Sequence, residues 1–569
     1  MIKVSDYIAE FLEQQHVTHV FELIGGMITH MLDSIHKRGR VHIVSVHHEQ
    51  GAAFAADAMG RITGIPGVAL ATSGPGAVNL LTGIGSCYFD SAPAVFLTGQ
   101  VNRSEMRGDR PIRQLGFQET DIVAMAQPIT KAAWLARSPE EVPDLLARAF
   151  ALATNGRPGP VLVDLPMDVQ RGLIPEPMAQ SPGRAQPGRG IELGHLFDDL
   201  ARAERPLILA GGGVWSSRTS RELVELAERL GVPVVHSLMG VDILPVGHPL
   251  RAGMIGTYGN RWSNTALGLA DFVLVLGSRL DVRQTGADTL SFKNGKTLYH
   301  VDVDQAETNN RVLGCHAMVG HLREFFAMAM NALPRGLPQW TAWREQIETY
   351  RATWPDTAEL QGMAGINPNA CMHALSKHSG DVAAYVVDVG QHQMWAAQSL
   401  DLTPGQRFLT SGGMGSMGFA LPAAIGAAMA TQKPVMVIAG DGGFQCNIQE
   451  LQTVARNQLP LRMVVIDNHC LGMVRQFQES YFDGRYQSTM WGYSAPDFVR
   501  VAEAYGIQAR VARAPEEVDA AAQWLGQAKG PALLHVHVDA RANAYPKIAF
   551  GRPITDMEPL EKPIAMEST

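Results

Sequence analysis

Short apolar runs alternate with longer amphipathic stretches along most of the chain. In the first third, the apolar runs lie at 17–23, 41–46, 67–72, 92–99 and 158–165. Each is about the length of one strand, and the stretches between them are long enough for a helix. Nearly continuous apolar strands are typical of parallel sheets that are covered on both faces. The pattern therefore predicts an α/β fold built from doubly wound parallel sheets with helices on both faces.

This alternation falls into three blocks, which we predict to be domains at 1–172, 191–335 and 366–550. The later apolar runs lie at 206–211, 233–238, 272–278, 297–303, 382–389, 434–439 and 461–466. A Pro/Gly-rich stretch at 174–190 predicts a linker between the first two blocks. A length of 569 residues also favours several domains over one. Because the first and third blocks share a strand–helix rhythm, they resemble a duplicated fold.

Composition excludes several classes of function. The net charge is −8 and no Lys/Arg run is present, which argues against a nucleic-acid partner. The apolar runs are shorter than the roughly 18 residues that a membrane span needs, and residues 1–15 read as an amphipathic helix rather than a signal peptide. The five cysteines include no CxxC pair, which suits a reducing cytoplasm without disulfides or a cysteine zinc site. We therefore expect a cytoplasmic protein.

The most informative stretch is 440–476, which contains two apolar runs that each end in a polar motif. Asp441 follows the first run and Asn468 follows the second, 27 positions later, about the length of one strand–helix–strand unit. Both side chains should therefore emerge at the carboxyl edge of a sheet, where α/β proteins bind ligands. Their oxygens suit Mg²⁺, which keeps water and phosphate as further ligands. Gly440, Gly442 and Gly443 would let the backbone approach a diphosphate, although an Asp-Gly turn alone is common.

Glu49 is a second candidate for chemistry. It lies between the apolar run 41–46 and a helical stretch, AAFAADAMGR. A carboxylate at this place can simply complement a helix dipole, or it can be a buried general acid/base. The apolar residues on both sides favour burial. The nearby TSGPGAVN segment at 72–79 reads either as an ordinary Gly-Pro turn or as a ligand-facing loop.

Two glycine-containing segments lie in the third block. GQHQMWAAQ at 390–398 follows an apolar run, and a histidine there is more often structural than catalytic. Gly413, Gly415 and Gly418 fit the spacing GxGxxG. We reject a dinucleotide fingerprint here, because the preceding strand is weak and no acidic residue follows at the required distance.

These motifs together resemble thiamin diphosphate enzymes, in which GDG is followed some 27 positions on by NN. Here Asp467 replaces the first Asn of that pair. The motifs occur in the same order as in acetolactate synthases, and this resemblance extends over almost the whole chain. The resemblance implies that Asp441, Asn468 and the backbone carbonyl of Cys470 bind Mg²⁺, and that Glu49 hydrogen-bonds and activates the aminopyrimidine of thiamin diphosphate.

The resemblance assigns further residues to the cofactor. Gln118, Gly25 and Gly26 would orient the donor substrate, while the carbonyl of Gly415 and the side chain of Met417 would hold the cofactor bent. The other cofactor-binding residues that it implies are Thr72, Pro75, Asn79, Gly390, Gln391, His392, Gln393, Gly440, Gly442, Gly443, Cys470, Leu471, Gly472 and Met473. Lys131 also matches the family, but a solvent-exposed lysine is the likelier interpretation of this position.

Acetolactate synthases also carry an FAD in the middle domain, and this chain is similar at the positions that hold it. These are Arg157, Gly211, Gly212, Gly213, Leu238, Met239, Met254, Gly277, Arg279, Asp281 and Asp302. A flavin-free middle domain is the alternative, and His321 departs from the family's usual Asp. Arg283 matches an arginine that meets the carboxylate of the acceptor, since a guanidinium pairs with a carboxylate in two-pronged geometry. The residue pattern alone favours a surface arginine.

The resemblance implies a transferase that decarboxylates pyruvate and passes the two-carbon unit to a carbonyl acceptor. Departures gather on the acceptor side: Leu23-Ile24, Met167, Ile255, Val282 and the Arg-rich loop 102–113. They leave open a ketone or nucleotide-linked keto-sugar as acceptor. A simple 2-keto-acid decarboxylase and an inactive partner subunit are further alternatives. The resemblance also implies a homodimer or homotetramer with the active site at the subunit interface.

Overall fold

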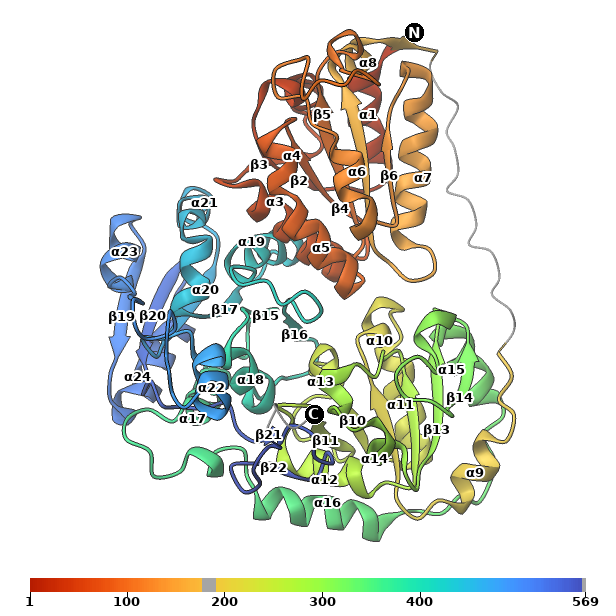
Figure 1. Ribbon diagram of the computed structural model, residues 1–569, viewed down its shortest axis with the longest axis vertical. Helices are drawn as coiled ribbons and strands as arrows, with labels where there is room; N and C mark the ends of the chain where they lie inside the picture. The colour runs from red at the N-terminus through yellow and green to blue at the C-terminus, as the bar shows by residue number, and fades with distance from the viewer. Residues whose placement is uncertain (176–190, 565–569) are drawn as a thin grey trace.

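The computed structural model describes residues 1–175 and 191–564, and it contains three six-stranded parallel sheets (Figure 1). This confirms the predicted α/β class with three doubly wound sheets. The N-terminal domain lies at the top of Figure 1, the middle domain at the lower right and the C-terminal domain at the lower left. Within the described residues, no helix is both long and apolar enough to cross a membrane.

The N-terminal sheet has the strand order β3-β2-β4-β5-β7-β6. Its strands are β2 (His19–Leu23), β3 (His42–Ser45), β4 (Gly67–Ala71), β5 (Ala94–Gln100), β6 (Ala132–Leu135) and β7 (Pro160–Pro166). Its helices are α1 (Val4–Gln14), α2 (Thr29–Arg38), α3 (Glu49–Thr63), α4 (Pro75–Asn79), α5 (Leu81–Asp90), α6 (Ile122–Ala126), α7 (Val142–Thr154) and α8 (Met167–Arg171). The sequence pattern missed β6, whose residues are only partly buried.

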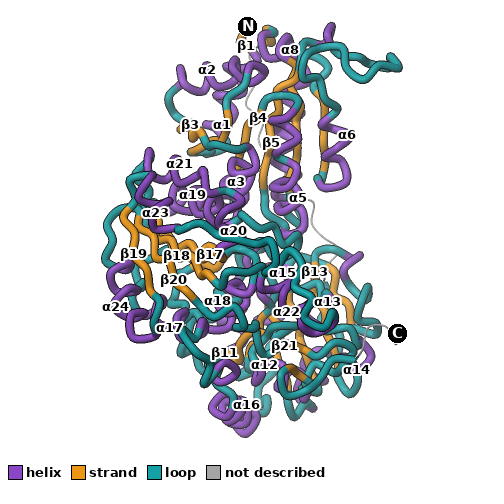
Figure 2. The backbone as a smooth tube through the Cα atoms, turned by 60° about the vertical axis from the view of Figure 1, so that its left-hand side comes forward, coloured by secondary structure: helices purple, strands orange, loops and turns teal. Residues whose placement is uncertain are grey.

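The C-terminal sheet has the order β16-β15-β17-β18-β20-β19, which repeats the order of the N-terminal sheet strand for strand. Its strands are β15 (Ala384–Val387), β16 (Arg407–Leu409), β17 (Val435–Gly440), β18 (Leu461–Asp467), β19 (Gln508–Ala512) and β20 (Ala532–His537). Its helices are α17 (Pro368–Lys377), α18 (Gln391–Ser399), α19 (Ala420–Thr431), α20 (Asp441–Cys446), α21 (Leu451–Arg456), α22 (Gly472–Tyr481), α23 (Phe498–Ala504) and α24 (Pro515–Gly526). The shared order supports the predicted duplication. In Figure 2 these strands lie between two helix layers.

The middle sheet has a different order, β11-β10-β9-β12-β13-β14. This is the 3-2-1-4-5-6 order of dinucleotide-binding domains, which bind ligands where the strand order reverses. The strands are β9 (Pro206–Ala210), β10 (Val234–His236), β11 (Arg251–Met254), β12 (Phe272–Leu276), β13 (Thr297–Asp302) and β14 (His316–Val319). The helices are α9 (Leu196–Arg202), α10 (Gly213–Ser216), α11 (Ser220–Leu230), α12 (Arg261–Leu269), α13 (Val282–Thr285), α14 (Thr289–Lys293) and α15 (Leu322–Asn331).

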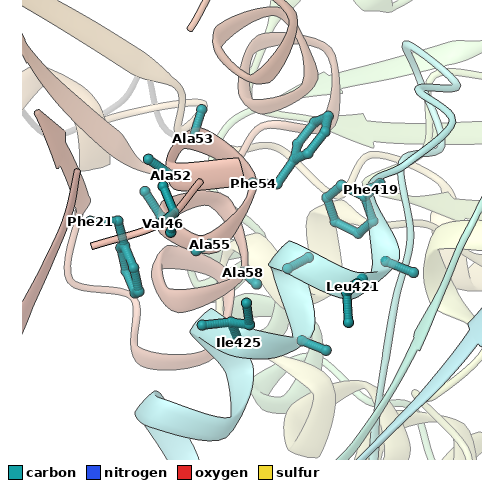
Figure 3. Packing of buried hydrophobic residues seen from close by; sticks show 14 of the residues in the cluster. Phe21, Val46, Ala52, Ala53, Phe54, Ala55, Ala58, Phe419, Leu421 and Ile425 are labelled. Carbon is teal, nitrogen blue, oxygen red and sulfur yellow. The ribbon is translucent and has the colours of Figure 1, made fainter. Parts of the chain in front are cut away.

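Helices α3 and α19 join the N-terminal and C-terminal domains through one continuous core (Figure 3). Phe54 packs edge-on against Phe419 with ring centroids 5.3 Å apart. A Cβ atom at Gly426 would lie 2.0 Å from the carbonyl oxygen of Ala55, so the helix backbones approach too closely for a larger residue. The alanine-rich sequences of both helices therefore bring the two domains together.

Segments between the domains also have structure. Leu173–Ile174 form β8, which pairs antiparallel with β1 (Ile2–Lys3), so the predicted linker cannot begin at 174; its remainder, 176–190, lies outside the described residues. Helix α16 (Thr341–Thr353) lies in the connection before the C-terminal domain. The final hairpin, β21 (Lys547–Ile548) with β22 (Met557–Glu558), packs into the core of the middle domain. The chain thus returns from the C-terminal domain to the middle domain.

Candidate active site

The first half of the site lies at the carboxyl edge of the C-terminal sheet. Strands β17 and β18 are neighbours with Gly440 beside Ile466, so Asp441 and Asn468 emerge at the same edge. Asp441 is buried, and the hydroxyl of Tyr493 donates to its Oδ2 over 2.9 Å. Asn468 donates through Nδ2 to Gln391 Oε1 over 3.0 Å. The two predicted metal ligands are therefore buried and held in place by hydrogen bonds.

The charges at this edge favour a cation. Burial and the neighbouring Asp467 raise the pKa of Asp441 to about 7. Although burial opposes it, hydrogen bonds from His535 and from the N–H of His469 hold the pKa of Asp467 below its ordinary value. A divalent cation would relieve the repulsion between these two carboxylates. The carboxylate and amide oxygens therefore fit Mg²⁺.

Several positions around Asp441 are glycine because neighbouring atoms leave no space there for a side chain. A Cβ at Gly440 would lie 2.8 Å from His392 Nδ1, and one at Gly472 would lie 2.0 Å from Gln391 Oε1. His392 accepts the N–H of Gly440 through Nε2 over 3.2 Å, and burial lowers the pKa of His392 to about 3, so the ring is neutral. Gly472 begins α22, whose first backbone N–H groups have no partner within the helix. Such an arrangement fits a diphosphate.

The segment 411–419 lies against the residues that surround Asp441. Gly415 and Gly418 have φ values of +68° and +84°, which favour glycine. Met417 lies close to the turn at 440–442, since a Cβ atom at Gly442 would be 3.3 Å from Met417 Cε. Asp388 fixes the segment by accepting the N–H groups of Gly418 and Ala420, both over 2.9 Å. The sequence analysis missed Asp388, whose only signal is its place at the end of an apolar run.

The remaining residues expected at the diphosphate lie close by. Leu471 would be 2.7 Å from a Cβ at Gly442, and the backbone N–H of Cys470 donates to Asn468 Oδ1 over 3.3 Å. Gly443 lies against the carboxylate of Asp388. Gly390 and Gln393 flank His392 at the start of α18, while Met473 is half-buried at the start of α22. The Nε2 of Gln393 donates to Thr410, the residue that follows β16.

The second half of the site lies in the N-terminal domain around Glu49, the first residue of α3. Glu49 is 5% exposed, as its apolar neighbours predict. Asn79 Nδ2 donates to Glu49 Oε2 over 2.9 Å. A Cβ at Gly76 would be 3.1 Å from Glu49 Oε1 and 2.9 Å from Thr72 Cγ2, so glycine preserves the space at Oε1. The structure thus brings Glu49, Thr72 and Asn79 together.

Two further predicted segments border this group. A Cβ at Gly25 would lie 2.4 Å from Thr72 Cβ, whereas Gly26 faces open space. Gln118 has φ +65° and lies against Gly74, just before Pro75 begins α4. Gln118, Gly25 and Gly26 therefore lie around the same loop as Thr72.

Lys131 corrects the sequence analysis, which favoured a solvent-exposed lysine. Its Nζ donates to the carbonyl oxygens of Leu152, Asn155 and Arg157, over 2.5, 2.7 and 2.7 Å. Burial lowers the pKa of Lys131 to about 8. The lysine side chain caps the carboxyl end of α7 and stabilises the turn that contains Arg157.

A buried ion cluster ties the N-terminal domain to the segment at 410–413. Arg61 bridges Asp57 at 2.6 Å and Asp90 at 3.2 Å, and Asp90 accepts the N–H groups of Gly412 and Gly413. Arg61 also donates to the carbonyl of Thr410 over 2.9 Å. The sequence analysis missed this cluster, because its members meet only in the folded chain.

A cavity of about 770 Å³ lies where all three domains meet. All but one of the residues expected to hold FAD line it: Arg157, Gly212, Gly213, Leu238, Met239, Met254, Gly277, Arg279, Asp281 and Asp302. Gly211 lies behind the lining, where a Cβ would be 2.2 Å from the carbonyl oxygen of Gly277. Arg283, which is exposed, and His321 also line the cavity.

Within one chain, hydrogen bonds join the surroundings of Glu49 to the C-terminal domain. The residues beside Glu49 contact the C-terminal domain: the N–H of His47 donates to Glu450, and Asn447 donates to Gln50, each over 2.9 Å. Glu49 itself accepts a side-chain hydrogen bond only from Asn79 among the described residues. Among the described residues, Glu49 and Asp441 therefore have different side-chain partners, Asn79 and Tyr493.

Comparison with known proteins agrees with this geometry. Three family descriptions match: Thiamine pyrophosphate enzyme, N-terminal TPP binding domain, at residues 2–125; central domain, at 193–328; and C-terminal TPP binding domain, at 388–536. The chain is 36% identical to the acetolactate synthase of Arthrospira platensis, with 96% of each chain covered. It is also 36% identical to the acetolactate synthase isozyme 2 large subunit of Escherichia coli (strain K12), covering 98% of this chain and 99% of that one. The chain therefore belongs to the acetolactate synthase family of thiamine pyrophosphate enzymes.

Proposed function

We propose that this protein is a thiamin diphosphate-dependent carboligase that decarboxylates pyruvate and transfers the two-carbon unit to a carbonyl acceptor. The observation that carries the proposal is the pair of buried half-sites: Glu49 with Asn79 in one domain, and Asp441 with Asn468 in another. The relatives named acetolactate synthase support the same reaction. An inactive partner subunit would not need both half-sites.

Thiamin diphosphate, when bound, would supply the electron sink that accepts the electron pair left as carbon dioxide departs. Glu49 would hold the proton that is shared with the pyrimidine. Since Asn79 occupies Oε2, Oε1 is the atom left for this exchange. Low solvent access favours it, because a poorly hydrated carboxyl group shares its proton readily.

The GDG edge would hold the diphosphate through Mg²⁺. Asp441, Asn468 and the carbonyl of Cys470 would supply the protein ligands, as in the family that the chain resembles. The raised pKa of Asp441 supports a cation at this position, because the isolated buried carboxylate resists ionisation. The glycines at 440, 442 and 472 leave the backbone accessible.

We propose that the 770 Å³ cavity binds FAD. The strand order of the middle sheet supports this, since domains with that order bind dinucleotides. The volume lies within the range of pockets that enclose whole ligands, about 300–1,000 Å³. The lining extends from Arg157 and Asp302 to Met394 and Gly413, so a long ligand would contact all three domains.

The substrates would be oriented from both sides. Gln118 and the backbone at Gly25 and Gly26 would face the donor, because they border Thr72 beside Glu49. Arg283 is exposed at the cavity and would pair with the carboxylate of a 2-keto acid acceptor. A simple decarboxylase would need a proton donor instead. The adjacent histidines His47 and His48 lie too near Glu49 in the sequence to be the histidine pair of such a decarboxylase, which favours carboligation.

We further propose a homo-oligomer, a dimer or tetramer, in which Glu49 of one chain faces Asp441 of another. Large apolar side chains are exposed beside both half-sites: Ile24 is 65% exposed, Phe117 80% and Met417 39%. Exposed apolar surface that is contiguous often marks a protein–protein interface. A second copy of this chain would cover them and complete the site.

Incubation with pyruvate, thiamin diphosphate and Mg²⁺ tests the reaction. Acetolactate is the expected product. Acetaldehyde would select the decarboxylase instead, and the absence of carbon dioxide release would refute the proposal. Adding 2-keto acids, simple ketones and nucleotide-linked keto-sugars in turn would then identify the acceptor. Flavin absorbance after purification with added FAD tests the cavity separately.

A further inference from the structure

A cluster of three histidines and one aspartate lies where β18, β20 and the loop that follows β18 meet. Asp467 ends β18, His535 and His537 lie on the neighbouring strand β20, and His469 lies in the loop. In the parallel pairing, Asp467 is directly opposite His537. Side chains from two strand ends and one loop therefore converge at this edge. The proposed reaction takes no ligand atom from these four side chains, although the charge of Asp467 also acts on Asp441.

The distances suit a bound cation. His469 Nδ1 lies 3.2 Å from Asp467 Oδ1, and His537 Nδ1 lies 4.0 Å from Asp467 Oδ2. One potential ligand atom from each of these three residues lies within 4.8 Å of the other two. The rings of His469 and His537 are 5.4 Å apart at their centroids. Small side-chain rotations would bring the three atoms to the spacing that bonds of about 2.1 Å to one metal require.

The hydrogen bonds of these residues are also compatible with metal binding. His537 makes no hydrogen bond through either ring nitrogen to the described residues, and its Nε2 is buried. Asp467 is fully buried, and His535 Nε2 lies 2.8 Å from its Oδ2. A second group behind a carboxylate is the usual way in which proteins orient metal ligands.

We propose that Asp467, His469 and His537 form a binding site for a borderline divalent transition metal such as Zn²⁺ or Co²⁺. Two imidazoles and one carboxylate are a common ligand set for these ions, whereas Mg²⁺ prefers an all-oxygen set. His469 is 63% exposed in its side chain, so the ion exchanges with solvent and keeps an open position for water. A metal ion bound at this site connects the loop at 467–470 to β20. Because Asn468 belongs to that loop, the ion stabilises the loop on which the proposed magnesium ligand lies.

The test uses the full-length protein saturated with Mg²⁺ and thiamin diphosphate, so that the oxygen site is filled before Co²⁺ is added. We expect one Co²⁺ per chain, seen as a saturable ligand-field absorption in the visible range that Zn²⁺ displaces. Loss of a supporting group usually weakens metal binding about 10–100-fold, so His469→Gln and His537→Ser should each weaken Co²⁺ binding by at least that factor. The Zn²⁺-dependent rise in melting temperature should shrink in parallel.

His373→Gln is the matched control. His373 also lies between carboxylates, 2.8 Å from Asp401 and 2.9 Å from Asp356, but both of its ring nitrogens are engaged. This variant should bind Co²⁺ like the unaltered protein. Because His469 is exposed, His469→Gln tests the site without risk to the core. Absence of saturable absorption, or unchanged affinity in either His469→Gln or His537→Ser, would overturn the proposal.

Discussion

Mixing two inactive variants should restore activity if each active site takes Glu49 from one chain and Asp441 from another. In each chain, Glu49 is held by Asn79 and Asp441 is held by Tyr493. Glu49→Gln removes the shared proton, and Asp441→Asn removes a charged metal ligand. Loss of a general acid/base typically lowers the rate by about 10²–10⁴-fold, so each variant alone should be nearly inactive.

The magnitude of the recovery follows from the symmetry. In a two-fold dimer of unlike variants, one site pairs an intact Glu49 with an intact Asp441, while the other site carries both substitutions. A mixed dimer should therefore have about half of the full activity, and a random equimolar mixture, in which about half of the dimers are mixed, should have about a quarter. A site formed within one chain would give no recovery, because every chain carries one substitution.

The assay is carbon dioxide release from pyruvate with saturating thiamin diphosphate and Mg²⁺. Co-expression of the two variants with different affinity tags, followed by purification on both tags, isolates the mixed dimers. Each variant purified alone serves as the baseline. If mixed dimers stay at that baseline while remaining folded and cofactor-bound, the assignment of Glu49 and Asp441 to one shared site across chains is wrong.

Three further predictions follow from individual contacts. Burial raises the pKa of Asp441 to about 7, and a metal ion needs the ionised carboxylate. Mg²⁺-dependent binding of the cofactor should therefore weaken about tenfold for each pH unit below 7 and should become independent of pH above 7. Titrations followed by tryptophan fluorescence between pH 5 and 9 would measure this dependence. Lys131→Met should lower stability by about 1–3 kcal/mol and reduce flavin retention, since three carbonyl oxygens lose their donor; an unchanged melting temperature would contradict it. Gly426→Ala places a methyl group 2.0 Å from the carbonyl of Ala55 and should destabilise the joint between domains by about 1–3 kcal/mol, whereas Gly530→Ala, in open space, should not.

The sequence predicted most of the strands that are buried on both faces, although it missed β20, in which five of six residues are buried. Such strands need apolar residues at every position, so runs like 435–440 and 461–466 are visible without knowledge of their neighbours. Five of the six edge strands of the large sheets were missed, and β3, which the run 41–46 predicts, is the exception. In β14 the first two residues are exposed, and β19 alternates exposed and half-buried positions, so neither contains an apolar run. Their pairing partners, which the local pattern does not contain, make them strands.

The same distinction explains which site residues could be predicted. Asp441 and Asn468 lie in one strand–helix–strand unit, so their spacing alone places them at one edge. Lys131 and Asp90 were missed as supporting residues, because their partners are determined by tertiary packing. Asp90, for example, accepts the N–H of Gly413, which is 323 positions away. A buried lysine and an exposed one look alike in a sequence when the acceptors are backbone carbonyls.

The shared strand order of the outer sheets gives a physical reason for two half-sites of different chemistry. Both sheets present their strand ends as ligand-binding edges, but the residues there differ. The N-terminal edge has the buried acid Glu49 beside small residues, which suits a neutral ring that shares a proton. The C-terminal edge has two close carboxylates that repel each other without a cation. A cofactor with a neutral ring at one end and a diphosphate at the other needs both edges, so neither domain alone would bind it well.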